Sequence, residues 1–171
     1  ELPRNDIQVI EITTAHEMRN AVMKHYKQCS IIIKAAAVAD FKCKNENCQK
    51  IKKNGTNTLL TIELERNPDI IAELGKLKGD RILVGFAAET DNMVERAYEK
   101  LKQKNLDLIV ANNVAKHGIG FGSDNNEVSI IDPKGHTKHV PILSKDEIAN
   151  IILDSVKRIM KKRQRLKEDW Y

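Results

Sequence analysis

Positively charged side chains that could bind phosphate occur in two places, and the first follows an apolar run that ends in an acid. Residues 30–41 read SIIIKAAAVADF, with Asp40 at the end of the run, and Lys50, Lys52 and Lys53 begin ten residues later. A short, nearly continuous apolar run is typical of a strand buried on both faces of a parallel sheet. Because ligands bind beyond the carboxyl ends of such strands, this stretch could hold a phosphorylated ligand. The stretch alone equally permits a core strand followed by a solvated, charged loop.

The second set of cations lies on one predicted helix. Arg96, Lys100 and Lys104 are spaced four residues apart and therefore form a row along the helix. Like charges at this spacing cost about 0.2–0.5 kcal/mol per pair, so helix stability does not explain the row. Glu95 and Glu99 could relieve the repulsion, and Lys104 would suit the negative end of the helix dipole. A bound polyphosphate would explain the row more directly.

A helix start and a strand end could complete an anion site. Asn67 is typical of a helix cap and Pro68 of a first helical position, and the exposed amides of a helix start can receive an anion. A plain capped helix is the other interpretation. The strand expected at 81–88 ends near Phe86, one aromatic ring among small residues at the edge where ligands bind.

Alternating strand and helix patterns predict the α/β class. Strand, helix and strand in that order imply right-handed parallel crossovers, while Asp-Pro-Lys-Gly at 132–135 predicts a hairpin turn. We therefore expect a Rossmann-like, mostly parallel sheet flanked by helices, with a C-terminal antiparallel hairpin. Capping boxes of Thr14 with Glu17 and of Ser144 with Glu147 indicate two helix starts. The expected strands are 7–12, 30–37, 59–64, 81–88, 107–111, 127–132 and 136–142, and the expected helices are 15–28, one starting near 67, 92–105 and one after 144.

Two further patterns resemble known sites but lack the required context. The run GIGFG at 118–122 suggests a dinucleotide loop, yet it leads into a strand instead of a helix, so we expect a flexible loop that could act as a lid. Cys43 with Cys48, and His136 with His139, have spacings found in metal sites. However, the cysteines lack a second ligand pair at a suitable spacing, and the histidines lie in an expected hairpin strand. We therefore predict no metal-ligating residues.

Composition restricts the class of partner. The 171 residues carry a net charge of +5, concentrated in the last helix and tail, which we interpret as a solvated face. Aromatic residues make up only 4% of the chain, too few for stacking platforms that bind single strands. No apolar stretch is long enough to span a bilayer. We expect a cytoplasmic protein with no nucleic-acid or membrane partner.

Several ordered motifs together resemble one enzyme family. The matching segments are AAAVADF (35–41), KIKK (50–53), NPDII (67–71), VGFAAET (84–90), the lysines of the following helix and DLIVANNV (107–114). On these segments the chain resembles phosphopantothenoylcysteine synthetase, the ligase half of the bacterial bifunctional coenzyme A biosynthesis protein. The resemblance covers most of residues 1–171, which we expect to form a single synthetase-like domain.

The resemblance implies a ligase that uses CTP. The carboxylate of 4′-phosphopantothenate would attack the α-phosphate of CTP, releasing pyrophosphate, and the amine of L-cysteine would then displace CMP from the acyl-cytidylate. A carboxylate must approach a triphosphate in the first step, so cations and a metal ion are needed to neutralise charge. The resemblance implies Mg²⁺ bound mainly through the phosphates, a homodimer, and fusion to a flavin-dependent decarboxylase domain in the full-length protein.

Residue roles also follow from the resemblance. Lys50, the first lysine of KIKK, would be catalytic and would stabilise phosphate charge in the first step. The implied nucleotide-binding residues include Lys50 itself, backbone at a strand end, an acid, a helix start, one aromatic ring and two lysines of the cationic helix. They are Ala36, Asp40, Lys50, Pro68, Asp69, Ile70, Ile71, Phe86, Lys100 and Lys104.

The chain departs from the family pattern at its N-terminus. The family opens with a glycine-rich segment and an asparagine associated with converting the acyl-cytidylate, and neither has a counterpart before the IQVIEI run at 7–12. We therefore expect the domain to be incomplete at this end. The alternative function is a non-catalytic nucleotide-binding relative or fragment. A nicotinamide oxidoreductase is a third possibility, which the absent glycine fingerprint disfavours.

Overall fold

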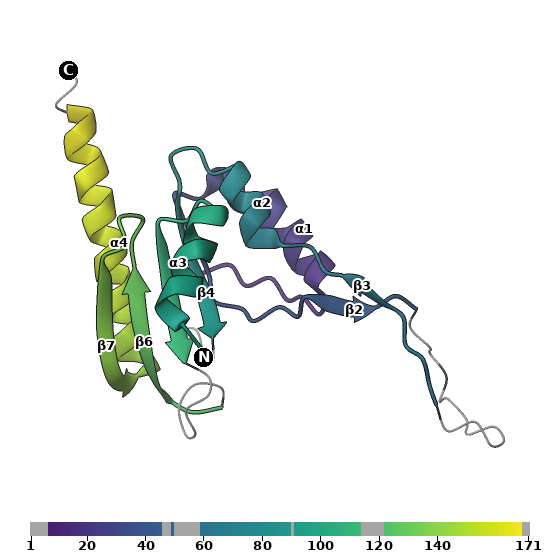
Figure 1. Ribbon diagram of the computed structural model, residues 1–171. Coiled ribbons are helices and arrows are strands. Elements are labelled where there is room, and N and C mark those ends of the chain that lie inside the picture. Colours follow the sequence, from purple (N-terminus) through teal and green to yellow (C-terminus); the bar gives the residue numbers. More distant parts are fainter. Residues whose placement is uncertain (1–6, 46–48, 50–58, 90, 114–121, 169–171) are drawn as a thin grey trace. The chain divides into compact units, whose positions relative to one another are not determined.

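Contacts divide the chain into two units, which are described separately. The computed structural model describes residues 7–45, 49, 59–89, 91–113 and 122–168 (Figure 1). The first unit comprises Glu1–Lys27 and Ala37–Ile70, and the second comprises Gln28–Ala36 and Ile71–Tyr171.

The second unit is built on a five-stranded mixed sheet. The strand order is β1-β4-β5-β6-β7, with β1, β4 and β5 parallel and with β6 and β7 antiparallel to their neighbours. The predicted α/β class, parallel sheet and C-terminal hairpin are thus confirmed. The strands are β1 (Ile31–Lys34), β4 (Ile82–Glu89), β5 (Leu108–Asn113), β6 (Asn125–Ile131) and β7 (Thr137–Ser144).

Helices α3 (Met93–Gln103) and α4 (Lys145–Glu168) cover opposite faces of this sheet (Figure 1). Side chains alternate between faces along a strand, so Ile82 and Val84 of β4 share one face, where they pack with Ile152 and Val156 of α4. Leu83, on the other face, is fully buried. Burial of the sheet on both faces explains why the strand patterns read as continuous apolar runs.

Helix α3 is the crossover between the parallel strands β4 and β5. It therefore begins near the carboxyl end of β4 and returns to the amino end of β5. Its buried residues are Ala97 and Leu101. Gly75, in α2 (Ile70–Lys76), allows close approach of the end of α3, because a Cβ built on Gly75 would lie 2.0 Å from the carbonyl oxygen of Lys104.

Local sequence determines where α4 and its preceding hairpin start. The turn before β7 contains Gly135 at φ +85°, a conformation that favours glycine, and its amide donates to the carbonyl of Asp132. The predicted capping box is present, because Ser144 Oγ accepts from the amide of Glu147 at 3.3 Å while the Glu147 carboxylate accepts from the amide of Ser144 at 3.0 Å. The residues of α4 that pack on the sheet are Ile148, Ile151, Ile152, Val156 and Ile159.

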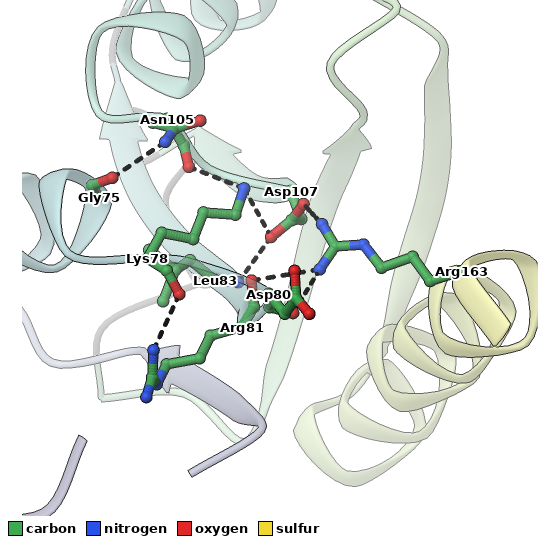
Figure 2. A network of polar contacts seen from close by, with 8 residues as sticks. All are labelled: Gly75, Lys78, Asp80, Arg81, Leu83, Asn105, Asp107 and Arg163. Carbon is green, nitrogen blue, oxygen red and sulfur yellow. Dashed lines mark hydrogen bonds and ion pairs between the residues drawn. The ribbon is translucent and has the colours of Figure 1, made fainter. Parts of the chain in front are cut away.

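A charged network fastens α4 to the amino edge of the sheet (Figure 2). Asp107, which is buried, immediately precedes β5 in the sequence. Its carboxylate accepts from the amide of Leu83 at 2.8 Å and pairs with the ammonium of Lys78 at 2.9 Å. Its other oxygen pairs with the guanidinium of Arg163, which also donates to the carbonyl of Asp80 at 2.8 Å. Three separate segments of the second unit therefore meet at one buried acid.

The first unit holds a helix and a short strand pair. Helix α1 (Ala15–His25) starts with the predicted Thr14–Glu17 capping box and continues into a 3₁₀ turn, Tyr26–Gln28. Strands β2 (Phe41–Cys43) and β3 (Leu64–Arg66) pair antiparallel.

Four predictions of local structure were wrong. Residues 7–12 form no strand, because no described segment pairs with their backbone. The strand expected at 30–37 is shorter and forms an edge of the sheet, so it is only partly buried. The strand expected at 59–64 begins only at Leu64, where pairing with β2 starts. Asn67 does not cap the next helix, since α2 begins at Ile70 and the Asn67 side chain bonds elsewhere.

Candidate functional site

A buried acid lies between two cations at the carboxyl end of β4. Glu89, the last residue of the strand, is only 7% exposed. Its Oε1 lies 2.6 Å from Nζ of Lys100, and its Oε2 lies 4.0 Å from Nη1 of Arg96. A carboxylate loses its hydration when it is buried, so partners of opposite charge are required here. The predicted row of cations on α3 is thus organised by an acid from the sheet.

Helix geometry explains how Arg96 and Lys100 reach the same carboxylate. Residues four apart lie on one face of a helix, and helical side chains lean toward the helix N-terminus. That direction carries the ammonium of Lys100 back toward the carboxyl end of β4. Lys104 is the C-cap of α3, one further turn away from that end, and its amide donates to the carbonyl of Lys100 at 3.0 Å.

The cluster keeps an excess of positive charge near the surface. One carboxylate faces two cations, and the Lys100 and Arg96 side chains are 45% and 56% exposed. An ammonium has three N–H donors and a guanidinium has five, so pairing with Glu89 does not exhaust either group. An anion arriving from solvent could therefore bind both cations while Glu89 still holds them.

Phe86, the aromatic ring predicted at the strand end, lies on the face of β4 opposite to Glu89. Phe86 and Glu89 are three residues apart in a regular strand, so their side chains point to opposite faces. The ring is 39% exposed. A ligand that touched both Phe86 and Lys100 would have to pass around the end of the strand. Ala36, just after β1, accepts from the ammonium of Lys34 at 3.0 Å through its backbone oxygen.

In the first unit, Asn67 ties two predicted nucleotide-binding segments together. Its amide donates to the carbonyl of Asp40 at 2.8 Å, and its side-chain Nδ2 donates to the carbonyl of Ala39 at 2.9 Å. The segment after the apolar run is therefore held against the segment that leads into α2. The Asn67 Oδ1 is buried and has no hydrogen-bond partner among the described residues. Pro68 follows, half-buried, with an exposed Asp69.

The remaining predicted site residues are distributed as follows. Ile70 and Ile71 are buried, which leaves only their backbone to meet a ligand. Lys50 lies outside the described residues, as does the GIGFG run apart from Gly122. Asp40 belongs to the first unit, whereas Phe86, Lys100 and Lys104 belong to the second. Convergence of these residues on one ligand therefore stays a prediction.

Sequence reasoning missed the role of Glu89 as the partner of the cationic row. It placed the end of that strand near Phe86 and considered only Glu95 and Glu99 as charges that relieve the repulsion. An acid that closes an apolar strand, followed by cations at four-residue spacing on the next helix, was the available signal.

Within the described residues, no group of three or more His, Cys, Asp or Glu side chains could hold a metal ion. Among the same residues, no helix is both long and apolar enough to cross a bilayer.

The fold and the cluster define an α/β domain with a cationic helix beside the carboxyl end of a central strand. The chain belongs to the family described as DNA/pantothenate metabolism flavoprotein C-terminal domain, which matches residues 1–160. This result confirms the resemblance inferred from the motifs.

Individual relatives agree with this assignment. The chain is 44% identical over 159 residues to the coenzyme A biosynthesis bifunctional protein CoaBC of Bacillus subtilis, covering 93% of this chain and 39% of that protein. It is 41% identical over 152 residues to a cysteine/cysteine sulfinic acid decarboxylase from an unknown prokaryotic organism, covering 88% of this chain and 42% of that protein. The crystal structure of the C-terminal domain of a CoaBC protein superposes with a TM-score of 0.71 at 35% identity, covering 90% of this chain and 68% of that one. The chain thus spans about two fifths of the length of these two curated relatives.

Proposed function

We propose that this chain catalyses the CTP-dependent ligation of 4′-phosphopantothenate with L-cysteine. A carboxylate oxygen of 4′-phosphopantothenate attacks the α-phosphorus of CTP, and pyrophosphate leaves. The cysteine amine then attacks the acyl carbon of the acyl-cytidylate, and CMP leaves with the amine proton lost to solvent. The product is 4′-phosphopantothenoylcysteine, a step of coenzyme A biosynthesis.

The observation that carries this proposal is the family match over residues 1–160, which includes every motif of the implied site. The cationic cluster supports it, because the first step brings a carboxylate toward a triphosphate and needs fixed positive charge. Lys100 and Arg96 offer such charge on a rigid helix. By resemblance, Lys50 acts in the first step and Lys104 joins Lys100 on the phosphates. Asp40 and residues 68–71 line the nucleotide site, Phe86 borders the base or ribose, and the strand end at Ala36 supplies backbone contacts.

We propose that Mg²⁺ enters this reaction on the triphosphate of CTP. The family resemblance supports this proposal, and it implies a metal held mainly by phosphate oxygens. The chain's own contribution is then the positive charge of its lysines.

We further propose that the chain acts as a homodimer. Several large apolar side chains on and near the strand pair β2–β3 are exposed. They are Phe41 of β2, Leu64 of β3, and Leu59 and Leu60, which precede β3; Leu59 is 85% exposed. Large apolar side chains gathered in one exposed segment are typical of an interaction surface. A second copy of the chain is the partner implied by the family.

A pyrophosphate-release assay with 4′-phosphopantothenate, cysteine and CTP tests the ligase activity. We expect release that requires both 4′-phosphopantothenate and CTP, with CTP preferred over ATP. Lys50→Gln should lower the rate by about a hundredfold or more if it stabilises phosphate charge, whereas Lys162→Gln, exposed on α4, should not. If CTP raises the melting temperature but no pyrophosphate forms, the chain is a non-catalytic nucleotide-binding relative.

A further inference from the structure

Glu89 has no part in the ligation described above, although it contacts two cations of the helix α3. It is more than nine-tenths buried, and it reaches Lys100 at 2.6 Å and Arg96 at 4.0 Å. We propose that Glu89 is a positioning residue, which orients Lys100 and Arg96 as a pair toward the polyphosphate of the nucleotide. This inference rests on the proposed function, because it concerns the same ligand.

A positioning residue must itself be held rigidly, and β4 holds Glu89 in this way. Glu89 is paired in register with Asn113 of β5, and its strand neighbours on the same face, Leu83 and Ala87, are buried. A long lysine side chain on a helix surface loses conformational entropy when it is fixed. If Glu89 fixes Lys100 before the ligand arrives, that loss no longer opposes binding.

Orientation also leaves donors for the ligand. The Lys100 ammonium gives one of its three N–H groups to Glu89, so two can face an anion. The longer 4.0 Å approach of Arg96 leaves most of its planar guanidinium available, and this group can bind two phosphate oxygens at once. The cluster would recognise a flexible chain of phosphates, with the base and ribose bound elsewhere.

The proposal makes a prediction opposite to that of simple charge counting. Removing the carboxylate makes the cluster more positive, so electrostatic attraction alone predicts tighter binding of a polyphosphate. Loss of positioning predicts weaker binding. Glu89→Gln, which keeps the shape and one acceptor oxygen, separates the two effects.

The experiment is calorimetric titration of the full chain with CTP and with inorganic tripolyphosphate. We expect Glu89→Gln to weaken both ligands about fivefold or more, and Lys100→Gln to weaken them further, with the double variant no weaker than Lys100→Gln alone. Glu99→Gln, an exposed acid next to Lys100, is the matched control for charge and should bind as the wild type does or slightly tighter.

A second variant guards against a folding defect in Glu89→Gln. Glu89→Asp keeps the buried charge but withdraws the carboxylate by one methylene, so it should also weaken both ligands while its melting temperature stays near that of the wild type. Unchanged or tighter binding in both Glu89 variants would overturn the proposal and leave the proposed function intact. A wild-type chain that binds neither CTP nor tripolyphosphate would overturn both.

Discussion

Arg163, on the last helix, and Asp107, just before β5, form an ion pair although 56 residues separate them in the sequence. The pair lies at the amino edge of the sheet, and Lys78 contacts the same acid (Figure 2). Glu89 occupies the corresponding position at the carboxyl end of β4, where it also faces two cations. Among the described residues, each end of the parallel core therefore holds one buried acid, but only the cluster at the carboxyl end lies where ligands bind in α/β sheets.

Arg163→Ala should destabilise the second unit by about 1–3 kcal/mol, because it removes one partner of a buried carboxylate and two backbone contacts. Arg165→Ala, an exposed cation on the same helix, should change the free energy of unfolding by less than about 0.5 kcal/mol. Denaturant unfolding of both variants checks this. Equal effects would mean that the network at Asp107 contributes nothing specific.

Gly75→Ala should be more damaging than Gly85→Ala. A Cβ on Gly75 would meet the backbone carbonyl of Lys104 at 2.0 Å, whereas one on Gly85 would meet the end of the Leu106 side chain at 2.7 Å. Backbone cannot move aside as a side-chain methyl can, so we expect a cost at or above the usual 1–3 kcal/mol for overpacking at Gly75 and a smaller one at Gly85. The reverse order of melting temperatures would contradict the close approach of α2 and α3.

The capping box of α4 should make stability depend on pH. Hydrogen bonds from the Ser144 hydroxyl and then from its amide lower the pKa of Glu147 below its ordinary value. A lowered folded-state pKa means that this contribution is present above the ordinary glutamate pKa and is lost as pH falls through the folded value. Ser144→Ala should cost about 1 kcal/mol at pH 7, with a smaller difference from wild type at pH 3.

Glu147→Gln is the control for this prediction, since its side chain does not titrate. In this background, adding Ser144→Ala should lower the free energy of unfolding by the same amount at every pH over the same range. If the difference in unfolding free energy between the wild type and Ser144→Ala does not shrink toward pH 3, the capping carboxylate is not its source.

Much of the second unit could be predicted because its pattern is local. The bounds predicted for β4, α3 and β5 differ from the observed ones by two residues or fewer, and α4 starts where its capping box predicts. Three of the four predictions that failed concern segments whose structure depends on a partner strand. Residues 7–12 have the composition of a strand, but backbone hydrogen bonds require a neighbour, and none of the described segments supplies one.

The candidate site was predictable only in its chemistry. The four-residue spacing identified Arg96 and Lys100 as a cationic row, yet the acid that orients them comes from a different element. Asn67 shows the same limit, because its sequence neighbours suggest a helix cap while its side chain bonds to Ala39, 28 residues away. Polar groups that pair over long sequence distances produce no periodic pattern from which the pairing could be predicted.

Exposed apolar residues near β3 should determine the oligomeric state. Leu60→Glu with Leu64→Glu should convert a dimer into a monomer, because two buried charges would oppose association. Leu153→Glu, an exposed leucine of α4, is the matched control and should leave the dimer intact. Sedimentation velocity distinguishes the outcomes, and a dimer that survives the double substitution would move the interface elsewhere.

The fate of the carboxylate oxygen is the measurement that tests the proposed ligation most directly. With 4′-phosphopantothenate labelled by ¹⁸O in its carboxylate, attack on the α-phosphorus followed by cleavage at the acyl carbon transfers one labelled oxygen to CMP. Mass spectrometry of CMP formed with cysteine and CTP should show that single label. Unlabelled CMP, or no CMP at all, would contradict an acyl-cytidylate formed by this chain.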